Sequence, residues 1–170
     1  MVTVRPAGPE DAQACVDVLA SSPDFFTRET HDEARTGVAN ERAEAARYRA
    51  GVAADAGLVV GFVLAEIRYP ATAEITYAAV RPERRGAGVG TRLVRWALAD
   101  LAGDGVALVE VKTLDVSAGY EPYEATRAFW ERRGFRQLDC IDPLPGWQPG
   151  NPAAIHVAAI RSTTARDFSD

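Results

Sequence analysis

Cysteine is scarce in this sequence, and long apolar runs are missing from it. The 170 residues include two cysteines, Cys15 and Cys140, which lie far apart in the chain. Such a pair argues against a disulfide framework or a cysteine-based metal site, so we expect two small buried side chains and no metal. No apolar run is long enough to span a bilayer, and no signal-peptide pattern opens the chain. We therefore expect a cytoplasmic protein with no membrane partner.

The sequence also lacks an excess of positive charge. It has 19 Lys and Arg against 24 Asp and Glu, a net charge of −5. Nucleic-acid-binding domains are usually basic, so this balance argues against a nucleic-acid partner and is compatible with a cationic amine substrate. A hydrophobic content of 47% and a charged content of 25% are ordinary for a soluble protein. We expect one domain over residues 1–161 and a polar tail over residues 162–170.

The most informative stretch is a glycine-rich loop between a strand-like segment and a helical segment. Gly86, Gly88 and Gly90 alternate there, and Arg85 stands just before them. Glycine lets a backbone approach a ligand closely and adopts φ values that other residues avoid. A helix that begins at such a loop exposes free N–H groups, and its dipole favours negative charge. The loop therefore predicts a phosphate-binding site.

Two common phosphate-binding motifs fit this loop poorly. A P-loop ends in Gly-Lys-Ser/Thr, whereas Gly90 is followed by Thr91 and Arg92. A dinucleotide fingerprint that starts at Gly86 would need glycine at position 91, and the expected first strand of its βαβ unit is missing. A glycine-rich turn without a ligand remains the plain structural alternative.

Periodicity and turn residues predict an alternating order of strands and helices. We expect the first helix to start at Pro9, a second between Asn40 and Arg49, a third after Gly90, and a fourth from Tyr123 to Arg133 that ends at Gly134. Strands are predicted over residues 2–5, 51–55, 58–68, 73–80, 106–112, 135–141 and 154–160.

Two motifs in this order resemble those of the GCN5-related N-acetyltransferase (GNAT) family. The loop Arg85-Gly86-Ala87-Gly88-Val89-Gly90 is similar to the R/Q-x-x-G-x-G/A loop of that family. The segment 126–135, with Ala128, Phe129 and a Gly-Phe ending, resembles its late helix. The resemblance spans nearly the whole chain. It implies an α/β (α+β) fold with a mixed, mostly antiparallel seven-stranded sheet flanked by helices.

The resemblance implies acetyl-coenzyme A as cosubstrate and a site for it in the middle of the chain. In the family the glycine loop holds the pyrophosphate, and the backbone before it pairs with the pantetheine arm like an added strand. The implied coenzyme A residues are Ala79, Val80, Arg85, Gly86, Ala87, Gly88, Val89, Gly90, Thr91 and Trp130. We expect the sheet to splay between the strand that ends at Val80 and the strand that starts at Val106.

The candidate catalytic residues lie on both sides of that loop. A primary amine is almost fully protonated at pH 7, so a carboxylate near the acceptor is needed as a base. The resemblance favours Glu74, which period-two alternation places on one face with Thr76 and Ala78, and Glu110 is a second candidate. A strand-end carboxylate that faces water is the alternative reading of Glu74.

The candidate acid is less well defined. The tyrosine that often protonates the coenzyme A thiolate in this family is Trp130 here, and an indole N–H does not ionise usefully. Tyr123 and Tyr120 lie nearby and can donate a proton, although packing against the start of the helix is the favoured reading for either one alone.

The sequence thus predicts an N-acetyltransferase that moves an acetyl group from acetyl-coenzyme A to a primary amine of a small molecule or peptide by direct attack in a ternary complex. A catalytically silent acyl-coenzyme A-binding module of the same fold is the alternative, because Trp130 replaces the usual acid. A nicotinamide-dependent oxidoreductase is a third reading. A homodimer, common in the family, is a further expectation.

Overall fold

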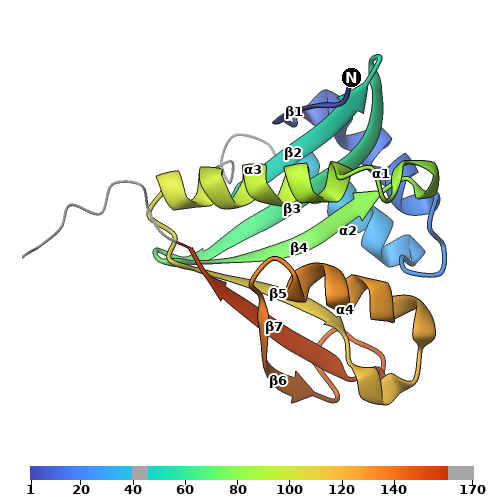
Figure 1. The fold of residues 1–170 in the computed structure, drawn as a ribbon, viewed down its shortest axis with the longest axis vertical. Helices are drawn as coiled ribbons and strands as arrows, with labels where there is room; N and C mark the ends of the chain where they lie inside the picture. Colours follow the sequence, from blue (N-terminus) through green and yellow to red (C-terminus); the bar gives the residue numbers. More distant parts are fainter. Residues whose placement is uncertain (40–45, 161–170) are drawn as a thin grey trace, which may run out of the picture.

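A computed structural model describes residues 1–39 and 46–160. Its strands form a seven-stranded sheet in the order β1-β2-β3-β4-β5-β7-β6 (Figure 1). Neighbouring strands are antiparallel except for β4 and β5, which are parallel. The strands are β1 (Thr3–Pro6), β2 (Tyr48–Asp55), β3 (Leu58–Tyr69), β4 (Thr72–Val80), β5 (Leu108–Leu114), β6 (Arg136–Ile141) and β7 (Ala153–Ala159). This is the mixed, mostly antiparallel sheet that the sequence predicted.

Helices cover both faces of this sheet. The α-helices are α1 (Ala12–Ala20), α2 (Arg28–Val38), α3 (Val89–Gly103) and α4 (Glu124–Glu131). Short 3-10 helices are η1 (Pro9–Asp11), η2 (Pro82–Arg84), η3 (Val116–Ala118) and η4 (Glu121–Tyr123). Residues of α3 and α4 belong to one buried cluster with the sheet, and residues of α1 and α2 belong to a second. The two helix pairs therefore pack on opposite faces.

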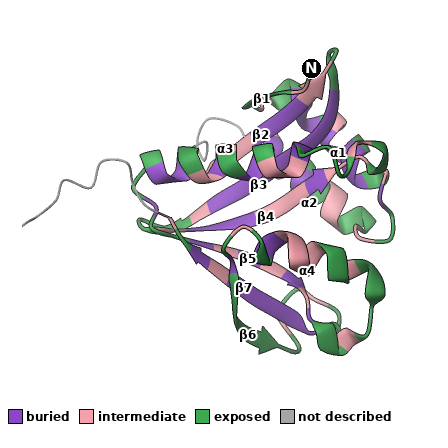
Figure 2. Cartoon of the chain, in the orientation of Figure 1, coloured by how far each residue is buried: buried purple, intermediate pink, exposed green. Residues whose placement is uncertain are grey.

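Apolar side chains at helical spacing build each layer. Leu93, Ala97 and Leu101 of α3 recur every fourth residue, are at most 1% exposed and pack on one face of the sheet. Phe62 of β3 is fully buried on the other face, beneath α1 and α2. Full burial of a side chain of this size contributes roughly 1.5–3 kcal/mol. Figure 2 shows buried residues along the central strands, while β6 at the sheet edge is exposed.

The parallel pair β4 and β5 separates partway along its length. Register pairs run from Thr72 with Leu108 to Ile75 with Val111 and end there. Strand β4 continues to Val80 while it stays paired with β3 on its other edge. The two strands diverge visibly in Figure 1. The splay that the sequence predicted is thus present, and it leaves one edge of β4 unpaired by β5 beyond Ile75.

The second helix and one cysteine were predicted wrongly. A helix lies at Arg28–Val38, where the sequence predicted none. Residues 40–45 of the predicted helix lie outside the described residues, and Tyr48 and Arg49 belong to β2. Cys15 is buried as predicted, but Cys140 is exposed because β6 is an edge strand. The predicted polar tail also lies outside the described residues.

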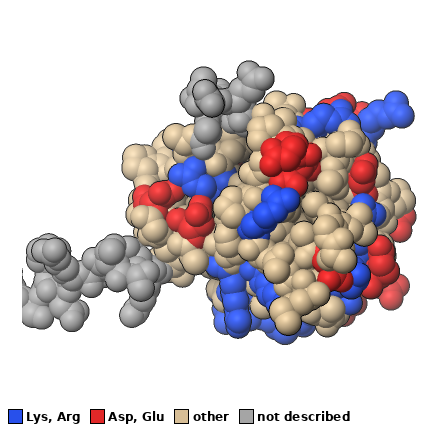
Figure 3. Space-filling view, turned by 90° about the horizontal axis from the view of Figure 1, so that it is seen from above, with Lys and Arg blue, Asp and Glu red and all other residues tan. Residues whose placement is uncertain are grey.

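The surface carries charges of both signs. On the face in Figure 3, acidic and basic side chains are interspersed, and basic ones gather along its lower edge. Among the helices of the described residues, none is long and apolar enough to cross a membrane.

Candidate active site

The glycine loop forms an open helix N-terminus. Gly88 is the N-cap of α3, and the first backbone bond of that helix runs from the N–H of Arg92 to the C=O of Gly88 at 3.1 Å. The amides of Val89, Gly90 and Thr91 precede this bond, so they point out of the helix end. These amides and the helix dipole are the features of a helix end that favour a phosphate group, and they lie at the loop for which the sequence predicted phosphate binding.

The three glycines of the loop serve different purposes. Gly86 and Gly88 have φ of +78° and +77°, in the left-handed region that side chains with a Cβ rarely adopt. A Cβ at either position would meet no protein atom within 4 Å. At Gly90 a Cβ would instead lie 3.1 Å from the ring of Phe129. Gly90 therefore lets α4 approach the start of α3, while the other two shape the turn.

A cavity of about 550 Å³ extends from this loop into the gap between β4 and β5. Its walls come from β4, the glycine loop, α3, β5, the η4–α4 segment and the loop between α1 and α2. Of the ten predicted coenzyme A residues, nine line the cavity and Ala87 does not. Elements far apart in the chain thus meet at one cavity.

The charged residues that line this cavity are all cationic. They are Arg84, Arg85, Lys112, Arg132 and Arg133, and none of the described lining residues is Asp or Glu. The whole chain has a net charge of −5, so this concentration of positive charge is local. A cavity of this kind favours a polyanionic ligand.

Arg133 lies beside the start of α3. Its guanidinium lies 3.4 Å from the ring centroid of Phe129 and donates a hydrogen bond to the hydroxyl of Thr91. Its Nε atom is buried without a hydrogen-bond partner among the described groups. Burial, with Arg132 and Arg95 nearby, lowers the pKa of Arg133. No role was predicted for Arg133 from the sequence, although it belongs to the late-helix motif.

Arg85, predicted to bind the pyrophosphate, is turned toward the opposite wall. Its Nε donates to the carbonyl of Val80 at 3.1 Å, and another guanidinium nitrogen donates to the hydroxyl of Ser22. The guanidinium lies 5.7 Å from the ring centroid of Phe25. Arg85 therefore lines the cavity and ties the glycine loop to the loop between α1 and α2.

Aromatic side chains form the wall near η4 and α4. Tyr123 lines the cavity, and its ring centroid lies 5.2 Å from that of Phe25. Burial, and to a lesser extent the neighbouring Tyr120, raises the pKa of Tyr123, so its phenol stays protonated. Tyr120 is 38% exposed, does not line the cavity, and donates to the carbonyl of Asp24 at 3.4 Å. Only one of the two predicted acids therefore reaches the cavity.

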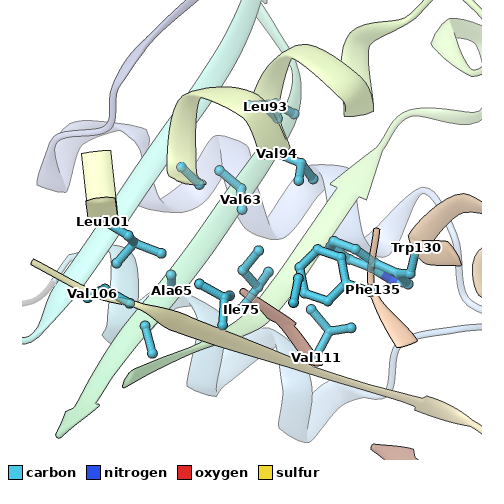
Figure 4. Packing of buried hydrophobic residues seen from close by; sticks show 14 of the residues in the cluster. Val63, Ala65, Ile75, Leu93, Val94, Leu101, Val106, Val111, Trp130 and Phe135 are labelled. Atoms are coloured by element: carbon cyan, nitrogen blue, oxygen red, sulfur yellow. The ribbon is translucent and has the colours of Figure 1, made fainter. Parts of the chain in front are cut away.

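Trp130 lines the cavity and also packs in the hydrophobic core. It is 6% exposed, and its ring lies 5.0 Å from Phe135 and 5.1 Å from Phe129, both edge-on. Figure 4 shows Trp130 and Phe135 side by side above Val111 of β5. This packing holds α4 against the splayed end of the sheet.

Glu74, the predicted base, is held by two cations. Its Oε2 accepts hydrogen bonds from Arg68 at 2.6 Å and from Lys112 at 2.8 Å. Glu74 is 8% exposed and is not among the cavity-lining residues. The Nζ of Lys112 also lies 2.6 Å from Oε1 of Glu110, whose side chain is 36% exposed. The two candidate carboxylates are thus bridged by one ammonium group, and Glu110 is the more accessible.

Ala78 was predicted to share a face of β4 with Glu74, and this prediction was wrong. Ile75 and Ala78 pack with the buried cluster on the α3 side of the sheet, whereas Tyr77 and Ala79 pack with the buried cluster on the α1/α2 side. A register shift between β3 and β4 occurs here and breaks the alternation. Glu74 therefore shares the α1/α2 side with Tyr77 and not with Ala78. The bulge was invisible in the sequence because neither glycine nor proline marks it.

Comparison with known proteins agrees with this geometry. The model of the acetyltransferase (GNAT) family matches residues 16–135. The chain belongs to the GNAT family. No curated protein matches the chain. Among the described residues of this GNAT protein, no group of three or more His, Cys, Asp or Glu side chains is placed to hold a metal ion.

Solved GNAT structures share the fold. A protein from Desulfovibrio desulfuricans assigned to the GNAT family has a TM-score of 0.82 and 25% identity, covering 94% of this chain and 99% of its own. The ribosomal-protein-S18-alanine N-acetyltransferase of Escherichia coli has a TM-score of 0.76 and 19% identity, covering 100% and 99%. An aminoglycoside 6′-N-acetyltransferase complexed with coenzyme A has a TM-score of 0.70 and 19% identity, covering 92% and 96%.

Proposed function

We propose that this GNAT protein is an acetyl-coenzyme A-dependent N-acetyltransferase that acts on a primary amine of a small molecule or peptide. The observation that carries the proposal is one continuous cavity. It starts at the exposed amides of α3, is lined by cations without acids, and ends in the gap between β4 and β5. Coenzyme A has the matching chemistry, a polyanionic end joined to an amide-rich arm that ends in sulfur.

Each part of the donor has a complementary part of the cavity. The amides between Gly86 and Thr91 would hold the pyrophosphate, and each N–H to a charged oxygen contributes roughly 1.5–3 kcal/mol. Arg133 adds an unpartnered donor next to them. The unpaired edge of β4 near Ala79 and Val80 offers backbone groups to the pantetheine arm. The backbone at Val80 would polarise the thioester carbonyl.

Proton transfer falls to residues on two sides of the gap. An amine with a pKa near 10 is neutral in only about one molecule in a thousand at pH 7, a cost of about 4 kcal/mol. Glu74 or Glu110 would accept the proton of the acceptor ammonium, directly or through water. Tyr123 would donate to the leaving thiolate, because its phenol lines the cavity and stays protonated.

Thiol release from acetyl-coenzyme A over a broad amine panel tests the base. We expect Glu74→Gln or Glu110→Gln to lower kcat about 100-fold or more while the Kd for coenzyme A changes less than about threefold. Glu66→Gln is the matched control, because Glu66 pairs with Arg68 on the same face but not with Lys112. If both variants keep full turnover, neither carboxylate is the base.

A silent coenzyme A-binding module is the second candidate, and Trp130 at the usual acid position favours it. Calorimetry that shows tight coenzyme A binding, together with no turnover on any amine, would support that reading over the enzyme. Absence of any heat with coenzyme A would contradict both.

A further inference from the structure

Lys112 is the only lysine in the chain, and it lies in the proposed active site. Its Nζ is 2.6 Å from Oε1 of Glu110 and 2.8 Å from Oε2 of Glu74. The Lys112 side chain is 22% exposed, and Lys112 is one of the residues that line the cavity. The proposed reaction requires a primary amine next to a carboxylate that can act as a base. Lys112, between two carboxylates at this wall, provides that arrangement.

The position of Lys112 along the strand strengthens this reading. The last register pair of the parallel strands joins Ile75 to Val111, and Lys112 is the next residue of β5. It therefore stands where β5 leaves β4 and where the cavity enters the sheet. The expected donor arm runs along the edge of β4 that this separation leaves open.

We propose that Lys112 is itself an acceptor and that the protein acetylates its own Nζ. The inference rests on the proposed function, because it needs acetyl-coenzyme A in the cavity. One proton of the Lys112 ammonium passes to Glu110 or Glu74 and on to water. The neutral Nζ attacks the thioester carbonyl carbon, the C–N bond forms and the C–S bond breaks. The second proton goes to the leaving thiolate, so the products are acetyl-lysine, coenzyme A thiol and one proton.

Two opposing effects set the rate of this reaction. Burial lowers the pKa of Lys112, but the hydrogen bonds to Glu110 and Glu74 outweigh this effect and raise the pKa above the ordinary value for lysine. An ordinary lysine is neutral in only about one molecule in 250 at pH 8, and the raised pKa makes the neutral form of Lys112 rarer still. Against this, an amine held beside a bound thioester gains an effective concentration on the order of 10⁵ M or more. We therefore expect Lys112 to be acetylated slowly and once per chain.

Acetylation of Lys112 would change the net charge of the residues around it. The groups around Lys112 are Glu110 on its own strand, Glu74 on β4, and Arg68 and Glu66 on β3. Loss of the ammonium leaves Glu74 paired with Arg68 and leaves Glu110 without its lysine. The site becomes more negative by one charge, which favours a cationic acceptor amine. Self-acetylation would therefore prime the site for its substrate.

Intact-mass spectrometry of the full chain with acetyl-coenzyme A tests this directly. We expect a gain of one acetyl group, placed on Lys112 by peptide mapping, which also separates it from the α-amine of Met1. The rate should rise about tenfold for each pH unit between 7 and 9, because the neutral fraction rises in that proportion. Lys112→Arg is the matched control, because it keeps the positive charge and lacks a nucleophilic amine.

Two further measurements keep the outcomes distinct. Excess coenzyme A should block the modification, and acetyl phosphate, which does not use the coenzyme A site, should not reproduce its rate. Labelling that persists under saturating coenzyme A is chemical acetylation and overturns the inference. If acetyl-coenzyme A binds and added amines are acetylated while Lys112 stays unmodified, the inference fails and the proposed function stands. If calorimetry detects no binding of acetyl-coenzyme A, both fail.

Discussion

At the scale of single residues, burial and partners separate candidates that the sequence treats as equal. Tyr123 and Tyr120 are both phenols at the start of the late helix, but only Tyr123 lines the cavity. Glu74 and Glu110 are register neighbours on parallel strands, but Glu74 has two cationic partners and is more buried. Candidate catalytic residues of the same type can thus be ranked by the number of their partners and by the exposed fraction of their side chains.

The paired tyrosines give a direct test of the acid. We expect Tyr123→Phe to lower kcat about 10- to 100-fold, because a general acid contributes at least that much and the thiolate still leaves without help. The Kd for acetyl-coenzyme A should change little. Tyr120→Phe should leave both quantities unchanged, and steady-state kinetics with calorimetry measure them. Equal loss in the two variants would show that the aromatic wall, not a proton, is responsible.

At the scale of elements, local signals predicted those helices that carry an apolar stripe or a strong end signal. Helix α4 was found from its Gly134 ending, and Gly134 does adopt φ of +86°. Helix α2 was missed because it is mostly polar, and Ala34, Gly37 and Val38 are its only buried residues in the described structure. The alanine-rich stretch that followed was a stronger local signal for a helix. Propensity alone therefore misplaced this element.

The N-terminus of α3 supports a prediction on binding. Gly88→Ala forces a Cβ into the left-handed region, so we expect a loss of about 1–2 kcal/mol in unfolding free energy and at least tenfold weaker coenzyme A binding. Gly103→Ala, in the last turn of the same helix with ordinary φ and open space, should raise stability slightly and leave binding unchanged. Denaturant unfolding and calorimetry report both effects. Unaltered binding in Gly88→Ala would mean that the loop does not hold the pyrophosphate.

At the scale of the whole molecule, a buried histidine links stability to pH. His156 of β7 is fully buried, with Nε2 3.3 Å from the hydroxyl of Thr113 and Nδ1 without a partner among the described groups. Burial lowers the pKa of His156, although Glu131 and Asp115 act against that shift and Arg127 acts with it. The unfolded chain therefore binds a proton more readily than the folded chain.

The consequence is a loss of stability on the acidic side. The contribution of His156 is fully present above its unfolded pKa of about 6.5 and is lost as the pH falls toward the lower folded pKa. We expect thermal unfolding to shift downward between pH 6.5 and 5, and less so in His156→Gln. The other histidine, His31, is half-buried on α2, and His31→Gln is the matched variant for the exchange of an imidazole for an amide. A profile unchanged in His156→Gln would contradict this assignment.

The sequence by itself determined the parts of this protein that depend on neighbouring residues. The glycines before α3, the turn at Gly134 and the apolar stripes follow from backbone preference and periodicity, which act over a few residues. These features carry the resemblance to the GNAT motifs, and that resemblance implied the fold class and nine of the residues that line the cavity.

Only the tertiary structure decided which side chains meet. The bulge in β4 turned Glu74 away from Ala78, and the parallel pairing of β4 with β5 brought Glu74 and Glu110 to the single lysine. Arg133 reached Thr91 only because α4 packs on α3 through Gly90. Such contacts join residues far apart in the chain, so they depend on strand register and helix packing, which no local preference specifies.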